Sequence, residues 1–217
     1  MDLRNFIETT FSGKAFSRPL FYAYPGGLRF ELSEGGTAIE LFLVAMRKAW
    51  EICSDIFPPS ATMAVCLRLH AARSETPYGL RRIVAQLKEA GIAISRERSI
   101  WAEPINREDW FDESDPEAWV NVAFRASTSL IPNLLWCAFA SGNIRPCLHS
   151  CLYLFNIEQR VMVWPYDDRG MDVVGPNHAL LASLFRKHRR YLLEHDIEVM
   201  CKTFNFESTS SAPSGER

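Results

Sequence analysis

Hydrophobic residues recur along the chain with two periods, which predict an alternation of helices and strands. Apolar positions at three- and four-residue steps share one face of a helix. They predict helices at residues 2–11, 37–57, 76–92, 176–194 and 196–204. Short alternating or continuous apolar runs bounded by turn residues predict strands. They occur at residues 20–24, 28–32, 61–70, 118–128, 147–156, 160–166 and 171–175.

The segment at residues 37–57 carries the clearest helix signals. Thr37 is followed three residues later by Glu40, which is the pattern of a capping box. Pro58 and Pro59 end the segment, because the residue before a proline disfavours the helical conformation. We expect the helix to pack on the sheet through an apolar stripe of Ile39, Phe42, Leu43, Met46, Trp50 and Cys53.

The order of these elements predicts an α+β fold, with a mixed, mainly antiparallel sheet and helices packed on one of its faces. Residues 131–146 fit either a short helix or an irregular connection. We expect a single domain over residues 1–206, with a division into two lobes, about 1–72 and 77–206, as the alternative. Residues 207–217 are rich in Ser, Pro and Gly and are predicted to be a disordered tail.

The composition predicts a large hydrophobic core and argues against several classes of protein. Of the 217 residues, 47% are hydrophobic, so a sizeable core can form. The formal net charge of −2 argues against a large nucleic-acid footprint, which is usually basic. No apolar run approaches the roughly 20 residues that cross a bilayer, and the first residues do not resemble a signal peptide. We therefore expect a cytoplasmic protein that does not bind membranes.

The sequence predicts neither a metal site nor a cofactor site. The six cysteines contain no CxxC pair, and Cys147, His149 and Cys151 form the nearest approach to a metal cluster. Within a strand these three would share one face, but a zinc site needs about four ligands. Core cysteines are the favoured interpretation. The chain also lacks the glycine-rich dinucleotide and nucleotide motifs, so no cofactor is predicted.

The stretch VWPYDDRGMDVVG, residues 163–175, raises the main functional question. Asp167 and Asp168 favour a turn, because an aspartate side chain accepts from a backbone N–H two residues on. Gly170 is expected to take a positive φ in a hairpin. A structural turn is thus the favoured interpretation, and a binding surface formed by Tyr166, Asp167, Asp168 and Arg169 is the second.

Catalysis is the third interpretation of this stretch. A ribonuclease needs a base, an acid and a cation that stabilises charge on phosphate. Asp168, Arg169, Asp172, His178 and His188 supply those groups if the helix that follows folds back over the hairpin. Nucleic acid is a partner only under this alternative. Whether the chain is an enzyme stays open, with a ribonuclease-like hydrolase as the enzymatic option.

Aromatic residues beside an acidic segment favour a different function, that of a protein-binding module. Residues 103–117 carry seven acidic side chains. Protein interfaces use aromatic anchors together with complementary charge. The anchors expected here are Trp101, Trp110, Phe111 and Trp119. The basic run at residues 185–191 is either a ridge that binds phosphate or an acidic partner, or a solvated helix face.

The C-terminal part of the chain resembles the bacterial domain-of-unknown-function family 3885. The matching features are a strand, the YDDRG turn, a second strand and the helix LLASLFRKHRRYLLEHD. The likeness covers residues 18–57 and 150–204 and is carried chiefly by residues 166–170. The resemblance implies a ribonuclease-like protein, but it supplies no established catalytic residues. The chain departs from the family at EHDI, residues 194–197. Small acidic bacterial proteins of this shape also resemble immunity or antitoxin proteins, for which the partner would be a toxin.

Overall fold

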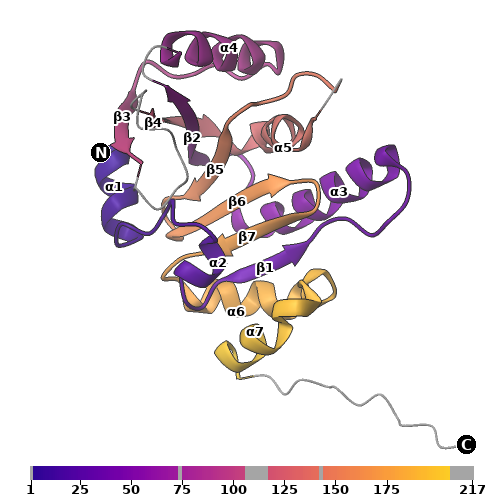
Figure 1. The fold of residues 1–217 in the computed structure, drawn as a ribbon. Helices are drawn as coiled ribbons and strands as arrows, with labels where there is room; N and C mark the ends of the chain where they lie inside the picture. Colours follow the sequence, from indigo (N-terminus) through magenta and orange to yellow (C-terminus); the bar gives the residue numbers. More distant parts are fainter. Residues whose placement is uncertain (1, 73–74, 106–116, 142–143, 206–217) are drawn as a thin grey trace, which may run out of the picture.

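A seven-stranded sheet forms the centre of the protein (Figure 1). The computed structural model describes residues 2–72, 75–105, 117–141 and 144–205. Within them the strand order is β1-β7-β6-β5-β2-β4-β3, and every pairing is antiparallel. The strands are β1 (Leu28–Glu31), β2 (Thr62–Ala72), β3 (Arg98–Pro104), β4 (Glu117–Ser127), β5 (Cys151–Asn156), β6 (Val161–Asp167) and β7 (Gly170–Val174). The predicted α+β class is confirmed.

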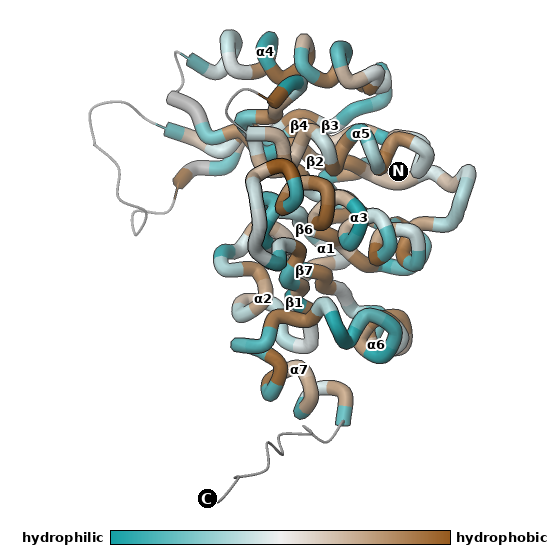
Figure 2. The backbone as a smooth tube through the Cα atoms, turned by 90° about the vertical axis from the view of Figure 1, so that its right-hand side faces the viewer, coloured by the Kyte–Doolittle hydropathy of each residue, from teal (hydrophilic) through white to brown (hydrophobic). Residues whose placement is uncertain are grey.

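Helices cover both faces of this sheet, so the expectation that they lie on one face is wrong. Figure 2 shows α3, α5 and α6 on one side and α2 on the other. The helices are α1 (Leu3–Thr10), α2 (Leu20–Ala23), α3 (Ala38–Ile56), α4 (Thr76–Glu89), α5 (Ile131–Phe139), α6 (His178–Lys187) and α7 (Ile197–Thr203). Short 3-10 turns occupy Thr128–Leu130, Arg189–Tyr191 and Glu194–Asp196.

The two faces of the sheet bury different clusters. The larger cluster lies under α3, α4, α5 and α6 and contains buried residues such as Ile52, Leu134 and Phe185. The smaller one packs α1 and the residues that follow it on the opposite face, with Ile7 and Phe155 fully buried. Apolar burial of this extent is the main stabilising contribution in a domain of this size.

Several predicted elements differ from the structure. Residues 20–24, expected to form a strand, contain the short helix α2. Residues 147–150 precede β5 instead of belonging to it. The helix expected over residues 176–194 ends at Lys187, with Asn177 as its N-cap. The edge strand β3 was not predicted at all. The uncertain segment at residues 131–146 begins with helix α5.

Helix α3 begins as predicted but buries a different face. Thr37 and Glu40 form both hydrogen bonds of the capping box. Ile39 of the predicted apolar stripe is nevertheless 72% exposed, and Leu43 is also exposed. Phe42 and Cys53 of the predicted stripe are buried, and the rest of the buried face consists of Ala45, Lys48, Ala49, Ile52 and Ile56.

The sheet joins strands from both of the stretches proposed as lobes, since β1 and β2 precede residue 73 and the other five strands follow residue 76. The predicted tail at residues 207–217 lies outside the described residues. Among the residues that the structure describes, none of the helices combines the length and the apolarity that a membrane crossing requires.

Candidate functional site

The YDDRG stretch forms the tight connection between β6 and β7. Asp167 ends β6 and Gly170 begins β7, so only Asp168 and Arg169 lie between the strands. Asp167 Oδ1 accepts a 2.8 Å hydrogen bond from the backbone N–H of Arg169. The Arg169 guanidinium donates back to Asp167 Oδ2 at 2.6 and 2.9 Å. Asp167 therefore stabilises the turn, and the Arg169 side chain is already paired with it.

Gly170 has a role other than the one predicted, because its φ is not positive. The ring of Tyr166 covers its Cα atom. A methyl group added at Gly170 would overlap the Tyr166 hydroxyl and approach the carbonyl oxygen of Phe30 to 3.0 Å. Burial under this packing raises the pKa of Tyr166 to about 12. Glycine is needed here for the close approach of an aromatic ring and not for an unusual backbone angle.

The catalytic candidates Asp168, Arg169 and His178 do not converge, and Asp172 and His188 pair with other residues, Arg29 and Asp55. Asp168 and Arg169 precede β7, whereas His178 begins helix α6 after β7 has ended. Five strand residues at about 3.3 Å each separate the two ends by roughly 16 Å. His178 is exposed and its ring lies 5.0 Å from the ring of Phe204. The ribonuclease interpretation therefore lacks the geometry of an acid–base pair around one bond.

A buried charged cluster lies at the base of the same hairpin, and we call it the buried arginine cluster. It consists of Arg29 on β1, Asp172 on β7 and Asp196 near the C-terminus. Arg29 Nε lies 2.9 Å from Asp172 Oδ1, and Arg29 Nη1 lies 3.2 Å from Asp196 Oδ2. The Asp172 side chain is wholly buried, and the Arg29 side chain is 14% exposed. The side of β1 that carries Arg29 is therefore a largely buried ion site.

Neighbouring groups complete this cluster. Asp172 Oδ2 accepts from the backbone N–H of Phe21 at 3.1 Å, and Asp196 Oδ1 accepts from the Tyr22 hydroxyl at 2.6 Å. The Arg29 guanidinium lies 5.0 Å from the ring centroids of both Phe21 and Tyr22. Burial raises the pKa of the Asp172 carboxyl, and the hydrogen bonds from Arg29 offset only part of that effect. Each buried charge thus has partners.

A second arginine lies further along the same face of the sheet. The guanidinium of Arg18 lies 5.0 Å from the ring centroid of Trp119 and 5.4 Å from that of Trp164. Trp164 in turn contacts Tyr166 edge to face at 5.3 Å, as expected for two residues on one side of β6. We call Trp119, Arg18, Trp164 and Tyr166 the arginine–aromatic row.

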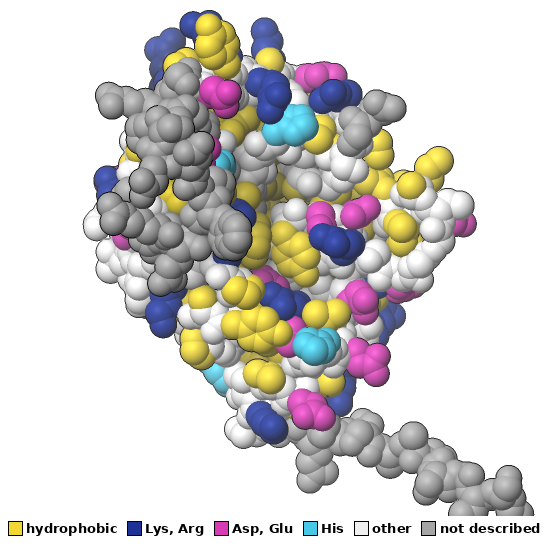
Figure 3. Space-filling model, viewed as in Figure 1, with side chains coloured by type: hydrophobic (Ala, Val, Ile, Leu, Met, Phe, Trp, Pro, Cys, Tyr) yellow, Lys and Arg dark blue, Asp and Glu magenta, His cyan; other side chains and the backbone are white. Residues whose placement is uncertain are grey.

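The row is partly open to solvent. Arg18 is exposed, and the three rings are half-buried. Arg18 donates to the Cys151 sulfur. Among the described residues no carboxylate lies within ion-pair distance of Arg18, in contrast to Arg29. Figure 3 shows this face, where hydrophobic side chains line a hollow with charged side chains at its rim.

The other predicted aromatic anchors have different positions. Trp101 is only 6% exposed, and its Nε1 donates to Glu103 at 2.8 Å, so it belongs to the core of this face. Trp119 belongs to the row. Trp110 and Phe111 lie outside the described residues. No local pattern marks Arg18, which lies between predicted elements, so the sequence indicated Trp119 and Tyr166 but not the arginine beside them.

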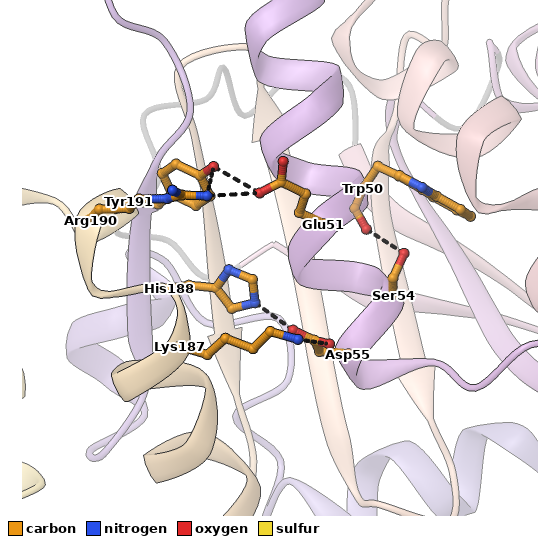
Figure 4. Close-up of polar contacts among 8 residues, drawn as sticks. All are labelled: Trp50, Glu51, Ser54, Asp55, Lys187, His188, Arg190 and Tyr191. Carbon is orange, nitrogen blue, oxygen red and sulfur yellow. Dashed lines mark hydrogen bonds and ion pairs between the residues drawn. The ribbon is translucent and has the colours of Figure 1, made fainter.

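Two carboxylates of α3 point toward the segment that follows α6 (Figure 4). Asp55 lies 2.6 Å from both Lys187 Nζ and His188 Nε2, and Glu51 accepts from the Tyr191 hydroxyl at 2.8 Å. Burial raises the pKa of Asp55, but the hydrogen bonds from Lys187 and His188 lower it overall. His188 is 4% exposed, so its imidazole is closed to a substrate, whereas the Asp55 side chain is 26% exposed. The contacts fasten the chain after α6 to α3.

These contacts also account for part of the basic run at residues 185–191. Lys187 pairs with Asp55, and Arg190 Nη2 lies 3.5 Å from Glu51. The guanidinium of Arg189 lies over the ring of Phe185. The acidic partner of this run is thus supplied largely by the chain itself.

The Cys147, His149 and Cys151 group does not form one strand face. Cys147 is buried and its thiol donates to the Ala140 carbonyl at 2.9 Å, whereas His149 is exposed. Cys151 begins β5 beside Arg18. In the described part of the chain, no three His, Cys, Asp or Glu side chains are grouped closely enough to hold a metal ion.

Comparison with known proteins gives one match. The family model "Domain of unknown function (DUF3885)" matches residues 3–196, which include the hairpin, the buried arginine cluster and the arginine–aromatic row. No curated protein and no solved structure matches the chain. The match confirms the resemblance over residues 18–57 and 150–196 and extends it to the segments before and between them, but it does not reach residues 197–204. The chain therefore belongs to the domain-of-unknown-function family DUF3885.

Proposed function

We propose that this chain is a non-enzymatic protein-binding module and that the arginine–aromatic row contacts its partner. One observation carries the proposal. Arg18 lies between two tryptophans in an exposed position and has no carboxylate partner among the described residues. Trp, Tyr and Arg are the residues in which the energetic centres of protein interfaces are enriched.

The chemistry of the row defines the partner. The indoles hold the Arg18 guanidinium in one place, which lowers the conformational entropy lost on binding. A guanidinium in this position favours a carboxylate, with which it forms two parallel hydrogen bonds. The half-buried rings of Trp164 and Tyr166 offer apolar surface beside it. The partner is therefore a protein that presents an Asp or Glu next to apolar side chains.

The likeness to immunity and antitoxin proteins makes a toxin the leading partner of this kind. Such proteins act by covering a surface of the toxin and need no catalytic groups of their own. The separation of Asp168 and Arg169 from His178 supports a binding role over catalysis.

The test compares three forms of the protein as bait in extracts of its native host. Wild type, Arg18→Ala and Arg186→Ala are immobilised, and retained proteins are identified by mass spectrometry. Arg186 is an exposed arginine on α6, on the opposite face, and serves as the matched control. We expect a protein that wild type and Arg186→Ala retain and that Arg18→Ala loses, with affinity reduced at least tenfold in calorimetry. Equal retention by all three forms would contradict the proposal.

A second assay addresses the enzymatic alternative directly. Purified protein is incubated with labelled RNA, with and without magnesium, beside Asp168→Ala and Arg169→Ala. We expect no cleavage by any form. Cleavage by wild type that both variants lose, with their circular dichroism unchanged, would replace the binding proposal with a ribonuclease.

A further inference from the structure

A cavity of about 650 Å³ lies between helix α4 and the end of the sheet formed by β2, β4 and β3. Its volume falls within the range of small-molecule sites in proteins. Apolar side chains dominate its walls, among them Leu67 and Leu69 of β2, Ile83 of α4, Ile94, Ile100 of β3 and Val122 of β4. It lies on the opposite face of the sheet from the arginine–aromatic row.

Two cations provide the charges of this cavity. In the described part of the chain, the charged residues of its lining are Lys88, in the last turn of α4, and Arg98, at the start of β3, and no Asp or Glu lines it. Both cations are exposed. Arg98 donates to the carbonyl of Ser95. The ion pairs between described residues include neither cation. The cavity thus combines an apolar interior with unneutralised positive charge.

We propose that this cavity binds a fatty acid, with the acyl chain among the aliphatic side chains and the carboxylate at Lys88 and Arg98. A neutral apolar ligand would leave the two cations unused. A small polar anion would leave the aliphatic walls in contact with water. An acyl chain with a carboxylate end satisfies both parts of the site.

The proposal predicts how affinity depends on the ligand. Each methylene moved from water into the cavity strengthens binding by about fourfold until the cavity is full. Replacing the carboxylate by an alcohol removes the charge interaction and weakens binding by about three- to tenfold. Octanoate, decanoate and dodecanoate, each below its micellar concentration, measure the first effect by calorimetry. Dodecanol measures the second.

Two variants locate the binding. Val84→Trp places an indole at the cavity, and Val84 is 50% exposed, so the substitution leaves the fold intact. Val199→Trp makes the same change on α7 at a residue of similar exposure, 51%, and is the control. We expect dodecanoate affinity to fall more than tenfold in Val84→Trp and to stay unchanged in Val199→Trp. Lys88→Gln with Arg98→Gln reduces the affinity for dodecanoate but not for dodecanol.

Three results would overturn the proposal. One is the absence of saturable binding of any of these acids to wild-type protein. Another is binding that Val84→Trp leaves unchanged, because the ligand then occupies a different place. The third is equal affinity for dodecanoate and dodecanol, which removes the role of Lys88 and Arg98.

Discussion

Two arginines of the α2-side face, Arg29 and Arg18, each lie over two aromatic rings but have different charge environments. Arg29 lies over Phe21 and Tyr22, and Arg18 lies over Trp119 and Trp164, at 5.0 to 5.4 Å in each case. Arg29 pairs with two buried carboxylates, whereas Arg18 has no carboxylate partner among the described residues. Aromatic stacking alone does not distinguish a structural arginine from one available to a ligand.

The charge balance and the solvent exposure do distinguish them. Two aspartates around Arg29 give a complete, dehydrated site, and leaving any member unpaired there is costly. Arg18 stays in contact with solvent, and its guanidinium N–H groups have no carboxylate acceptor among the described residues. The comparison predicts that substitutions at Arg29 mainly change stability, and that substitutions at Arg18 mainly change binding.

The largest expected effect is that of Arg29→Met. It leaves Asp172 buried without its cation, which should lower the free energy of unfolding by about 3–5 kcal/mol. Removing Arg29 also removes the interactions that lower the pKa of Asp172, so burial raises that pKa further, and the variant loses stability as the pH rises through it. Urea unfolding should therefore show a larger loss at pH 8 than at pH 5.

A double variant sharpens this result. Arg29→Met with Asp172→Leu removes the Arg29–Asp172 pair but still leaves Asp196 without its cation, so it should recover only part of the lost stability. If the double variant is less stable than the single one by a further 3 kcal/mol or so, the cost lies in packing and the ionic account is wrong.

Gly170→Ala should have the next largest effect, because its methyl group overlaps the Tyr166 ring. Overpacking of this kind costs about 1–3 kcal/mol, which thermal unfolding resolves as a shift of several degrees. In a Tyr166→Leu background the same substitution should cost much less. An equal cost in both backgrounds would place the strain in the backbone instead.

Asp55→Asn should remove about 1 kcal/mol at neutral pH, because the carboxylate pairs with Lys187 and His188 while partly exposed. The pKa of Asp55 is lowered from 3.8, so its contribution is present above that pH and disappears as the pH falls through the lower value in the folded protein. Denaturation curves of variant and wild type should therefore converge in acid. Glu158→Gln, at an exposed turn residue, is the control and should match wild type throughout.

The smallest effect on stability is expected for Arg18→Ala, below about 1 kcal/mol, since an exposed cation over aromatic rings contributes little. Its effect on partner binding should be the largest of the set. A loss of stability comparable to that of Arg29→Met would show that Arg18 is a structural residue.

Features that depend on neighbouring residues could be predicted from the sequence. The capping box of Thr37 and Glu40 and the turn held by Asp167 each join residues two or three positions apart. The hairpin strands around that turn followed from their apolar runs. The resemblance to DUF3885 rested on the same stretch and is confirmed over residues 3–196.

Features that depend on distant residues could not be predicted. Arg29 alternates with apolar residues as a solvent-facing residue does, and its partner Asp172 is 143 residues away. Residues 20–24 have the composition of a strand, but the N–H of Phe21 binds the same aspartate. The reason for Gly170 lies in the Tyr166 ring and the neighbouring strand β1. Asp168, Arg169 and His178 were close in sequence, yet β7 separates them.

The position of β1 has a consequence for synthesis of the chain. β1 pairs on one side with β7, and on its other side the N–H of Leu193 donates to the carbonyl of Arg29 while Phe30 bridges Leu192. An early strand thus receives both neighbours from segments that lie far later in the chain. The edge of the sheet stays unprotected on the ribosome until residue 193 has emerged.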